Sequence, residues 1–301
     1  MTIMGKFVLV AGFSVLALVF SVGAADAEAA VKAFRVGDLQ MWAIADSMGE
    51  RSMDVFKGAD PALLDRYVPT GKTPSAIMAF ALKMGGKTIL IDTGLGSPSG
   101  DRASRLMAGL KSIDLDPETI DVVLITHMHG DHIGGLIWDG KKAFPNAAVL
   151  IGKVELDFWL AGSSMEQYPS RKANFDLVRK VVDMYGDKVE TFAFDDKVAD
   201  GVTAVSAVGH TPGHTAFFIE SGSEKLLCIG DLLHAAALQF PHPEINAAYD
   251  MIPELAAVSR QTLLEFAATH NYLIAGMHLP FAGVGRVEKI GEGSYKYMPE
   301  L

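Results

Sequence analysis

The sequence predicts an α/β fold, a sandwich of two β-sheets flanked by helices. Short apolar runs rich in β-branched residues, which are typical of buried strands, occur in both halves of the chain together with stretches at helical spacing. The two halves also share an order of strands followed by a helix. Predicted strands end at residues 125, 208, 229 and 275, and each end is closely followed by a His or an Asp.

Strands and turns dominate the first half of the chain. Residues 34–45 partly alternate between apolar and polar side chains, which predicts a first strand. The Gly85-Gly86 pair predicts the turn of a hairpin. The predicted elements are, in order, a strand at 34–45, a short helix near 60–67, hairpin strands at 75–84 and 87–91, a helix at 102–112 and a strand at 122–125.

The second half contains the clearest helix, which begins at Pro253 because proline is favoured in a first helical turn. Ser221-Gly222-Ser223 marks the turn of a second hairpin. The predicted elements are, in order, a strand at 147–152, a helix from 153 to 160, an amphipathic segment at 174–184, strands at 190–194 and 202–208, hairpin strands at 216–220 and 225–229, a helix at 253–269 and a strand at 272–275.

Length and charge narrow the class of protein. A chain of 301 residues, half of them hydrophobic, can bury a large core as one α/β domain or as two fused halves. The net charge of −10 and the lack of a Lys/Arg cluster argue against a nucleic-acid partner. Cys228 is the single cysteine, so no intramolecular disulfide forms, and its apolar neighbours predict a small core residue.

The N-terminus has the pattern of an export signal. Lys6 supplies a positive charge, residues 7–22 are mostly apolar, and Ala25-Asp26-Ala27 is a small-x-small cleavage site. We expect residues 1–27 to be a signal peptide and 28–301 to be the folded domain, with an uncleaved membrane anchor as the alternative. The folded part is then periplasmic or secreted, without stable membrane association once the signal is removed.

Four side chains that can bind a metal lie within six residues, directly after the predicted strand at 122–125. They are His127, His129, Asp131 and His132. In extended backbone the first three share one side while His132 points elsewhere, so one loop can supply two neighbouring ions. Crowded imidazoles without a metal would repel on protonation and bury unpaired donors, so this motif predicts metal binding.

Three further strand ends supply ligands of the same kind. His210 lies in Gly-His-Thr-Pro-Gly-His, Asp231 follows Gly230, and His278 follows Gly276-Met277. Spacing alone leaves open how these ligands divide between two ions. His214, at the end of the Pro-Gly turn, is expected to be structural.

Together, these motifs resemble the metallo-β-lactamase superfamily over most of the chain after residue 75. The resemblance implies an αβ/βα four-layer sandwich and two divalent metals. It assigns His127, His129 and His210 to one metal and Asp131, His132 and His278 to the other, with Asp231 bridging both. The segments 157–160, 230–233 and 276–283 most resemble methyl-parathion-hydrolase-type enzymes and related lactonases and arylesterases, and this likeness also implies a homodimer.

Such a site would be hydrolytic. Two divalent cations polarise a carbonyl or phosphoryl oxygen, and water bound to them reaches a pKa of about 7, which gives an activated hydroxide between them. Zinc is expected first, while Co, Mn or Fe would also accept these ligands. Asp131 and Asp231 are the expected catalytic acids, and Asp92 is expected to support a ligand imidazole, with a turn-capping role as the alternative.

His234 lies three residues after Asp231, where related lactonases commonly carry a tyrosine that contacts substrate. It either hydrogen-bonds a substrate oxygen or leaving group, which would make it catalytic, or lines the pocket. The other residues expected around the pocket are large and apolar, with a place in the core as the alternative. The expected pocket residues are Phe158, Trp159, Phe175, Leu233, His234, Phe240 and Phe281.

Apolar pocket walls favour a small hydrophobic lactone or aryl ester, and phosphotriesters share the same developing oxyanion. No Lys/Arg cluster lies near the ligand motifs in the sequence, which weakens a glyoxalase-II-like thioesterase. A β-lactamase, an iron-dependent redox enzyme and a metal-stabilised binding module are the remaining alternatives.

Overall fold

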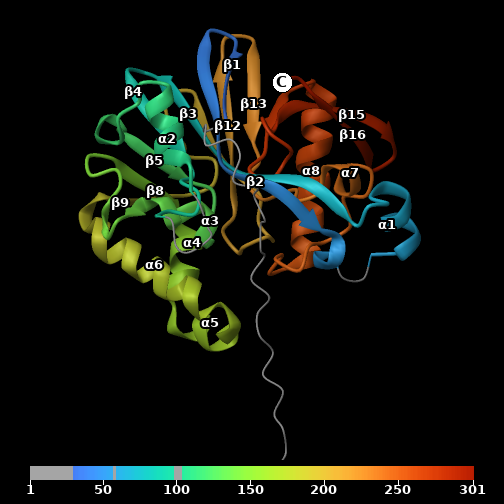
Figure 1. Ribbon diagram of the computed structural model, residues 1–301, viewed down its shortest axis with the longest axis horizontal. Helices are drawn as coiled ribbons and strands as arrows, with labels where there is room; N and C mark the ends of the chain where they lie inside the picture. Colours follow the sequence, from blue (N-terminus) through green and yellow to red (C-terminus); the bar gives the residue numbers. More distant parts are fainter. Residues whose placement is uncertain (1–29, 57–58, 98–103) are drawn as a thin grey trace, which may run out of the picture.

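The structure is a computed structural model that describes residues 30–56, 59–97 and 104–301. The predicted signal peptide and the start of the helix predicted at 102–112 lie outside these residues. Two seven-stranded sheets form the centre of the molecule (Figure 1). In spatial order, the first contains β1 (Val31–Val36), β2 (Leu39–Ser52), β3 (Lys72–Met84), β4 (Lys87–Ile91), β5 (Val122–Ile125), β8 (Ala148–Gly152) and β9 (Val189–Phe192).

The second sheet is built from the C-terminal half. Its order is β10 (Lys197–Ala199), β11 (Val202–Ser206), β12 (Thr215–Ser221), β13 (Glu224–Cys228), β14 (Leu273–Ala275), β15 (Val284–Gly291) and β16 (Ser294–Pro299). A small separate hairpin pairs β6 (Ile137–Trp138) with β7 (Lys141–Lys142). Parallel pairing joins β4, β5, β8 and β9 in the first sheet and β13 with β14 in the second, and the other pairs are antiparallel.

The described residues form eight α-helices, of which the longest lie on the outer sides of the sheets (Figure 1). They are α1 (Pro61–Tyr67), α2 (Leu106–Ser112), α3 (Gly130–Ile133), α4 (Lys153–Leu160), α5 (Gly162–Gln167), α6 (Lys172–Tyr185), α7 (Ala236–Gln239) and α8 (Pro253–His270). Short 3-10 turns occupy Met53–Val55, Pro117–Thr119, Gly134–Leu136, Pro169–Arg171 and Gly186–Lys188. No helix among the described residues combines the length and the apolar character needed to cross a bilayer.

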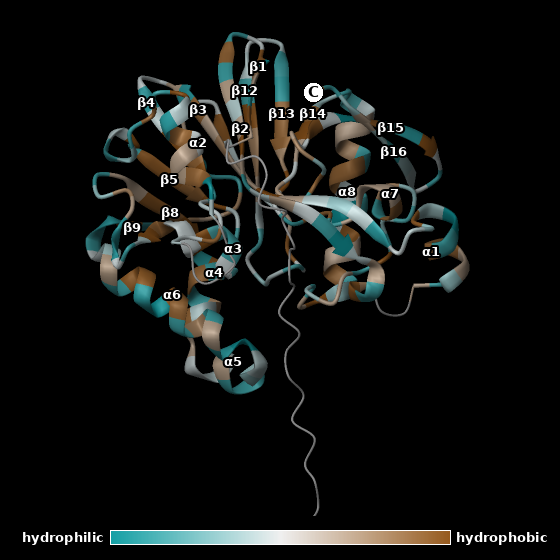
Figure 2. Cartoon of the chain, viewed as in Figure 1, coloured by the Kyte–Doolittle hydropathy of each residue, from teal (hydrophilic) through white to brown (hydrophobic). Residues whose placement is uncertain are grey.

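Three main cores define four layers. One core, which includes Phe80 and Phe217, lies between the two sheets. A second packs α2, α4 and α6 onto the first sheet, and a third packs α8 onto the second sheet. Figure 2 shows why these surfaces meet: β5 and β8 are almost uniformly hydrophobic, whereas α6 alternates between hydrophobic and hydrophilic residues. The predicted αβ/βα sandwich is therefore confirmed.

Two parts of the sequence interpretation need correction. The single strand predicted at 34–45 is a hairpin, because Gly37 turns the chain with a φ of +57° and β2 then pairs antiparallel with β1. Its alternation continues across this turn, which hides the break. The C-terminal hairpin β15–β16 was not predicted, since its strands carry exposed charged residues and few consecutive apolar ones.

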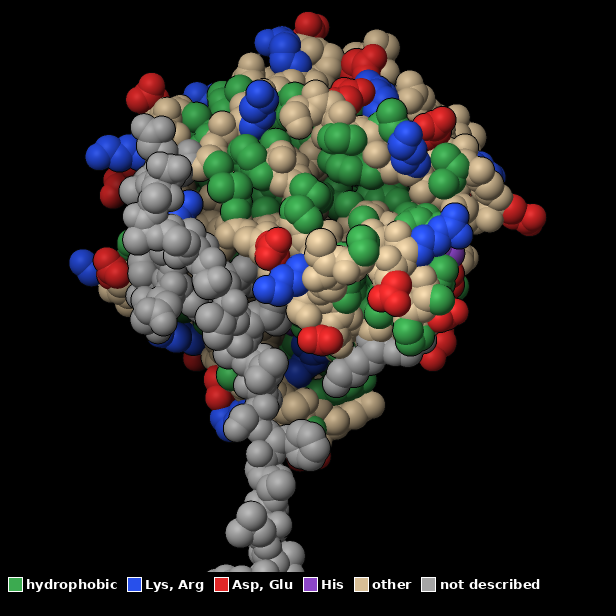
Figure 3. Space-filling model, turned by 45° about the vertical axis from the view of Figure 1, so that its right-hand side comes forward, with side chains coloured by type: hydrophobic (Ala, Val, Ile, Leu, Met, Phe, Trp, Pro, Cys, Tyr) green, Lys and Arg blue, Asp and Glu red, His purple; other side chains and the backbone are tan. Residues whose placement is uncertain are grey.

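One face of the molecule carries hydrophobic side chains among interspersed acidic and basic ones (Figure 3). Large exposed apolar residues of this chain include Leu255, Val258 and Phe266 on α8 and Ile290 and Met298 on the C-terminal hairpin. Nothing in a single chain tests the expected homodimer, which stays a prediction.

Candidate metal centre

The loop after β5 supplies ligands to two groups, and it does so through a change of backbone conformation. His129 is extended, with φ −71° and ψ 156°, and serves as the N-cap of the one-turn helix α3. The extended loop expected through Asp131 is therefore wrong. The turn of α3 directs Asp131 away from His127 and His129 and groups it with His132 and His278.

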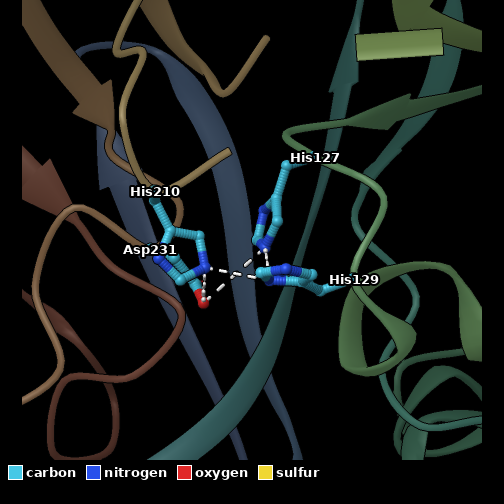
Figure 4. A group of neighbouring side chains, drawn as sticks. All are labelled: His127, His129, His210 and Asp231. Atoms are coloured by element: carbon cyan, nitrogen blue, oxygen red, sulfur yellow. Dashed lines mark hydrogen bonds and ion pairs between the residues drawn. The ribbon is translucent and has the colours of Figure 1, made fainter. Parts of the chain in front are cut away.

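The first ligand group contains His127, His129, His210 and Asp231 (Figure 4). His129 Nδ1 lies 3.0 Å from His127 Nε2 and 3.0 Å from His210 Nε2. Asp231 Oδ2 lies 3.2 Å from His210 Nε2 and 3.7 Å from His127 Nε2. These side chains come from the strand ends of both sheets and point toward one centre, so the group joins the two halves of the chain.

The second ligand group contains Asp131, His132 and His278. Asp131 lies 3.7 Å from His132 Nε2 and 3.4 Å from His278 Nε2. Asp231 also reaches this group, with Oδ1 at 3.1 Å from His132 Nε2 and Oδ2 at 3.0 Å from His278 Nε2. The carboxylate of Asp231 thus touches both groups, as a bridging ligand must.

The residues of both groups fit divalent cations. His132 Nε2 and Asp231 Oδ1 are buried and have no hydrogen-bond partner among the described residues, although they lie 3.1 Å apart. Burial, reinforced by neighbouring imidazoles, holds the pKa of His127 and of His129 well below the usual range. Neutral imidazoles are the form that binds metals, and a cation would satisfy the converging lone pairs.

The second nitrogen of each of three ligand histidines faces a fixed acceptor. His132 Nδ1 lies 2.7 Å from Asp92 Oδ2, and His278 Nδ1 lies 2.8 Å from the carbonyl oxygen of Ala76. His210 Nδ1 lies 2.9 Å from Asp250 Oδ1. Such contacts fix the tautomer and the ring orientation of a ligand. The structure places Asp92 in this supporting position, whereas Asp250 was missed because no strand or motif marks it in the sequence.

Glu155 is a second residue that sequence reasoning missed. Its buried carboxylate accepts hydrogen bonds from the backbone of Met128 at 2.8 Å and of Gly213 at 2.9 Å, and from the side chains of Trp159 and Thr211 at 2.7 Å each. Met128 lies between His127 and His129, and Thr211 follows His210. Glu155 therefore holds the two loops of the first ligand group together.

His214 fixes the backbone of Asp231 through a hydrogen bond. Its Nδ1 donates to the carbonyl oxygen of Ala207 at 2.8 Å, and its Nε2 accepts from the backbone N–H of Asp231 at 3.0 Å. The second bond requires the neutral ring, and burial lowers the pKa of His214 to about 3. The histidine thus positions a bridging acid and is engaged at both nitrogens.

Most of the expected pocket residues are packed in or against the hydrophobic cores. Trp159 and Phe175 are fully buried in the core between the first sheet and its helices, and Leu233 and Phe240 are buried beside α8. Phe158 and Phe281 are partly buried against the cores. These apolar side chains face the sheets because that is where the helices bury their apolar stripes. The alternative role, a place in the core, fits these four residues, and the pocket itself stays a prediction.

His234 does lie at the centre. Its Nε2 is 3.2 Å from Asp231 Oδ2, and its ring stacks on that of His278 with a centroid separation of 5.0 Å. Burial lowers the pKa of His234 to about 3, and its Nδ1 is buried without a hydrogen-bond partner in the described part of the chain. This imidazole is therefore neutral and has one nitrogen free beside both ligand groups.

Two arginines contradict the expectation that the site lacks basic residues. Arg171 Nη1 lies 3.0 Å from His129 Nε2, and Arg171 Nη2 donates to the carbonyl oxygen of Tyr249 at 2.9 Å. The guanidinium of Arg51 lies over the Tyr249 ring, 5.3 Å from its centroid. The sequence hides this arrangement because β2, the turn before α6 and the segment before α8 are far apart along the chain.

The comparisons with known proteins follow the same motifs. Residues 73–278 match the family model described as the metallo-beta-lactamase superfamily. Among solved structures, AidC, a dizinc quorum-quenching lactonase in complex with a product, superposes with a TM-score of 0.84 at 26% identity, covering 92% of this chain and 99% of that one. The hydrolase AbOPH in the beta lactamase superfamily has a TM-score of 0.82 at 30% identity, with coverages of 90% and 97%.

Curated relatives match over a smaller share of this chain. N-acyl homoserine lactonase AttM of Agrobacterium fabrum is 26% identical over 62% of this chain and 68% of its own length. Hydroxyacylglutathione hydrolase of Photobacterium profundum is 29% identical over 54% of this chain. This chain spans about half the length of that relative, 52%. The comparisons confirm the superfamily, while the narrower methyl-parathion-hydrolase likeness stays a prediction.

Proposed function

The chain belongs to the metallo-beta-lactamase superfamily, and from this membership and the site geometry we propose that it is a metal-dependent hydrolase that opens lactone esters. The observation that carries the proposal is the carboxylate of Asp231, which lies within 3.2 Å of His132, His210 and His278 and so touches both ligand groups. The likeness to the lactonases AidC and AttM supports the choice of substrate class.

The proposed cofactor is a pair of divalent cations, with zinc first because AidC is a dizinc enzyme. When bound, such cations supply an activated water and polarise the carbonyl oxygen. His127, His129 and His210 would hold one cation, Asp131, His132 and His278 the other, and Asp231 both. Cobalt, manganese or iron would accept the same donors.

The residues of this chain have separate roles in the proposed reaction. Asp231 would fix the cations relative to each other, Asp131 would hold one of them, and Asp92 would hold the ring of His132 through the contact at 2.7 Å. His234 is neutral and faces the Asp231 carboxylate through Nε2, so its free Nδ1 would accept a hydrogen bond from a hydroxyl of the substrate or leaving group. These roles require no further titrating base at the site.

Other ester substrates follow from the same chemistry. Aryl esters and phosphotriesters develop the same kind of oxyanion as lactones, so we propose them as secondary substrates. A hydroxyacylglutathione thioesterase is the second candidate. Arg51 and Arg171 favour it, because guanidinium groups bind the carboxylates that such a substrate carries. A β-lactam also carries a carboxylate, so the same arginines suit the β-lactamase alternative, whereas the iron-dependent redox alternative has no such observation in its favour.

A substrate panel on metal-reconstituted protein tests the proposal. The panel contains γ-lactones and N-acyl homoserine lactones, phenyl acetate, a phosphotriester, lactoylglutathione and nitrocefin, with bound metal measured in the same samples. We expect the highest kcat/KM for a lactone and loss of turnover after chelation. Faster turnover of lactoylglutathione would transfer the proposal to the thioesterase. A protein that binds two metals and hydrolyses none of these compounds would be a binding module.

The localisation and the oligomeric state of the protein are part of the proposal. Export to the periplasm or to the medium predicts a mature N-terminus near residue 28, which mass spectrometry of the processed protein measures. A retained N-terminus in membrane fractions would favour the anchor instead. The homodimer predicts twice the monomer mass in light scattering.

A further inference from the structure

We propose that Arg51 and Tyr249 form a carboxylate-binding subsite beside the second ligand group, so that the protein recognises a negative charge which the substrate carries or which hydrolysis creates. This inference rests on the proposed function, because it concerns the substrate of the same site. It differs from the sequence expectation of a pocket with apolar walls in which His234 is the polar residue.

Arg51 is an unusual residue for a buried position. Its side chain belongs to β2 and is 4% exposed, yet no acidic side chain in the described part of the chain forms an ion pair with it. Its Nε has no hydrogen-bond partner there, its hydrogen bond from Nη2 to Ser75 Oγ is long at 3.4 Å, and its other side-chain neighbour is the neutral phenol of Tyr249. A buried guanidinium is costly unless it is paired, so the position is explained by an anion that the single chain does not contain.

Tyr249 supplies the second donor. Its ring lies under the Arg51 guanidinium at 5.3 Å and beside the His234 ring at 5.4 Å. Its hydroxyl is buried and lacks a hydrogen-bond partner within the described residues. Burial, the largest influence, raises the pKa of this phenol, which therefore keeps its proton and can donate it in a hydrogen bond.

The subsite adjoins the metal ligands directly. Ser75, the contact of Arg51, donates to the carbonyl oxygen of His278 at 3.3 Å, and His234 stacks on the His278 ring. The nearby acids, Asp131 and Asp231, face the ligand histidines and would be engaged by the cations. With the cations bound, neither acid would then compensate the positive charge of Arg51. Guanidinium Nε–H and phenol O–H are thus two donors without hydrogen-bond partners beside the His234 ring.

A carboxylate is the anion that this set of donors and the proposed reaction share. Guanidinium and hydroxyl donors bind carboxylate oxygens through short, charge-assisted hydrogen bonds. Hydrolysis of any lactone or ester releases a carboxylate at the metal centre, a short distance from Arg51. A substrate with a free carboxylate near its ester is the second source, and the experiment separates the two.

The test measures binding and turnover in the metal-loaded protein. Calorimetry compares the ring-opened hydroxy acid of γ-decalactone with its neutral hydroxy amide. Kinetics compare monophenyl adipate, which carries a carboxylate, with phenyl hexanoate. The variants are Arg51→Gln and Tyr249→Phe, with Arg51→Lys as a variant that keeps the charge. Arg66→Gln, at an exposed position of α1, is the matched control.

We expect the parent protein to bind the acid about tenfold tighter than the amide, and Arg51→Gln to remove most of that preference. Tyr249→Phe should reduce it by about fivefold, and Arg66→Gln should leave it unchanged. A lower KM for monophenyl adipate that disappears in Arg51→Gln assigns the carboxylate to the substrate. Product binding without that KM difference assigns it to the product.

Two results overturn the inference. One is an equal affinity for acid and amide in the parent protein. The other is an unchanged preference in Arg51→Gln with both metals retained, because the acid would then bind only at the cations. Failure of the proposed function looks different: the acid preference would persist in a protein that hydrolyses no ester.

Discussion

At the scale of single residues, the geometry of the metal centre depends on side-chain atoms whose hydrogen bonds are all in use. Asp92 accepts from His132 and also binds the backbone N–H of Thr126 at 2.9 Å and its hydroxyl at 2.8 Å. Both oxygens are therefore occupied, and a change at this buried acid alters the ring orientation of a metal ligand. Its backbone is also unusual, since Asp92 has a φ of +58°.

Replacement of Asp92 by Asn should lower metal affinity or turnover by about 10- to 100-fold, because the amide loses the charge that fixes His132. Asn tolerates a positive φ as well as Asp does, so the fold should remain. Asp114→Asn is the matched control, since Asp114 is exposed and has a φ of +54°. Metal titration and kcat/KM measure the effect, and equal values for the two variants would contradict the supporting role of Asp92.

At the scale of elements, the sequence predicted the strands that deliver ligands better than the contacts that hold them. Runs such as 122–125 are buried on both faces, so their composition marks them clearly. The motifs identified the ligand residues, and the family resemblance, not their spacing, supplied the division into the two groups that the structure brings together. The turn at Gly37 was missed because the alternation continues across it, α3 because it is only one turn long, and the contact of Glu155 because its partners are distant in the sequence.

The pocket illustrates the same limit. Aromatic residues near the motifs, such as Trp159 and Phe175, have the same composition whether they line a cavity or a core. Only the packing of α4 and α6 on the sheet decides between these roles. Arg51 and Arg171 escaped notice for the opposite reason, since single basic residues outside any motif carry no signal.

Helix α4 contributes to the centre through Glu155. Glu155→Gln should destabilise the protein by about 1–3 kcal/mol, because the new amide group faces four donors and leaves some of them unpaired. Metal affinity of the first ligand group should fall as well. Urea unfolding and metal titration provide the measurements. Glu166→Gln, exposed on α5, is the control. Equal urea midpoints for both variants would contradict the stabilising role of Glu155.

At the scale of the whole molecule, the centre joins two sheets that otherwise meet through an apolar core. His127, His129, Asp131 and His132 come from the first half of the chain, whereas the remaining ligands come from the second. Cations bound here would connect the halves in the folded state only. Folding and metal occupancy are therefore coupled.

Chelation should accordingly lower the thermal midpoint of the protein. A cation at a thousandfold excess over its Kd stabilises the folded state by about 4 kcal/mol per site, and removal loses that amount. Calorimetry before and after chelation, followed by zinc addition, measures the change and its reversal. An unchanged midpoint in a sample shown to be free of metal would mean that the fold does not use the cations.

Acid should destabilise the metal-free protein in part through His214. Its folded pKa is about 3, below the ordinary value of 6.5, so between these values the unfolded chain takes up a proton that the folded chain refuses. The stability that His214 contributes is therefore present above pH 6.5 and is lost as pH falls toward 3.

His214→Gln keeps a donor for Ala207 and an acceptor for Asp231 but cannot titrate. Its stability gap to the parent should shrink by about 2 kcal/mol between about pH 7 and about pH 5. Urea unfolding at both pH values measures the gap, with His270→Gln at the exposed end of α8 as the control. A stability difference between the two proteins that is constant across this pH range would show that the neutral His214 ring does not stabilise the Asp231 loop.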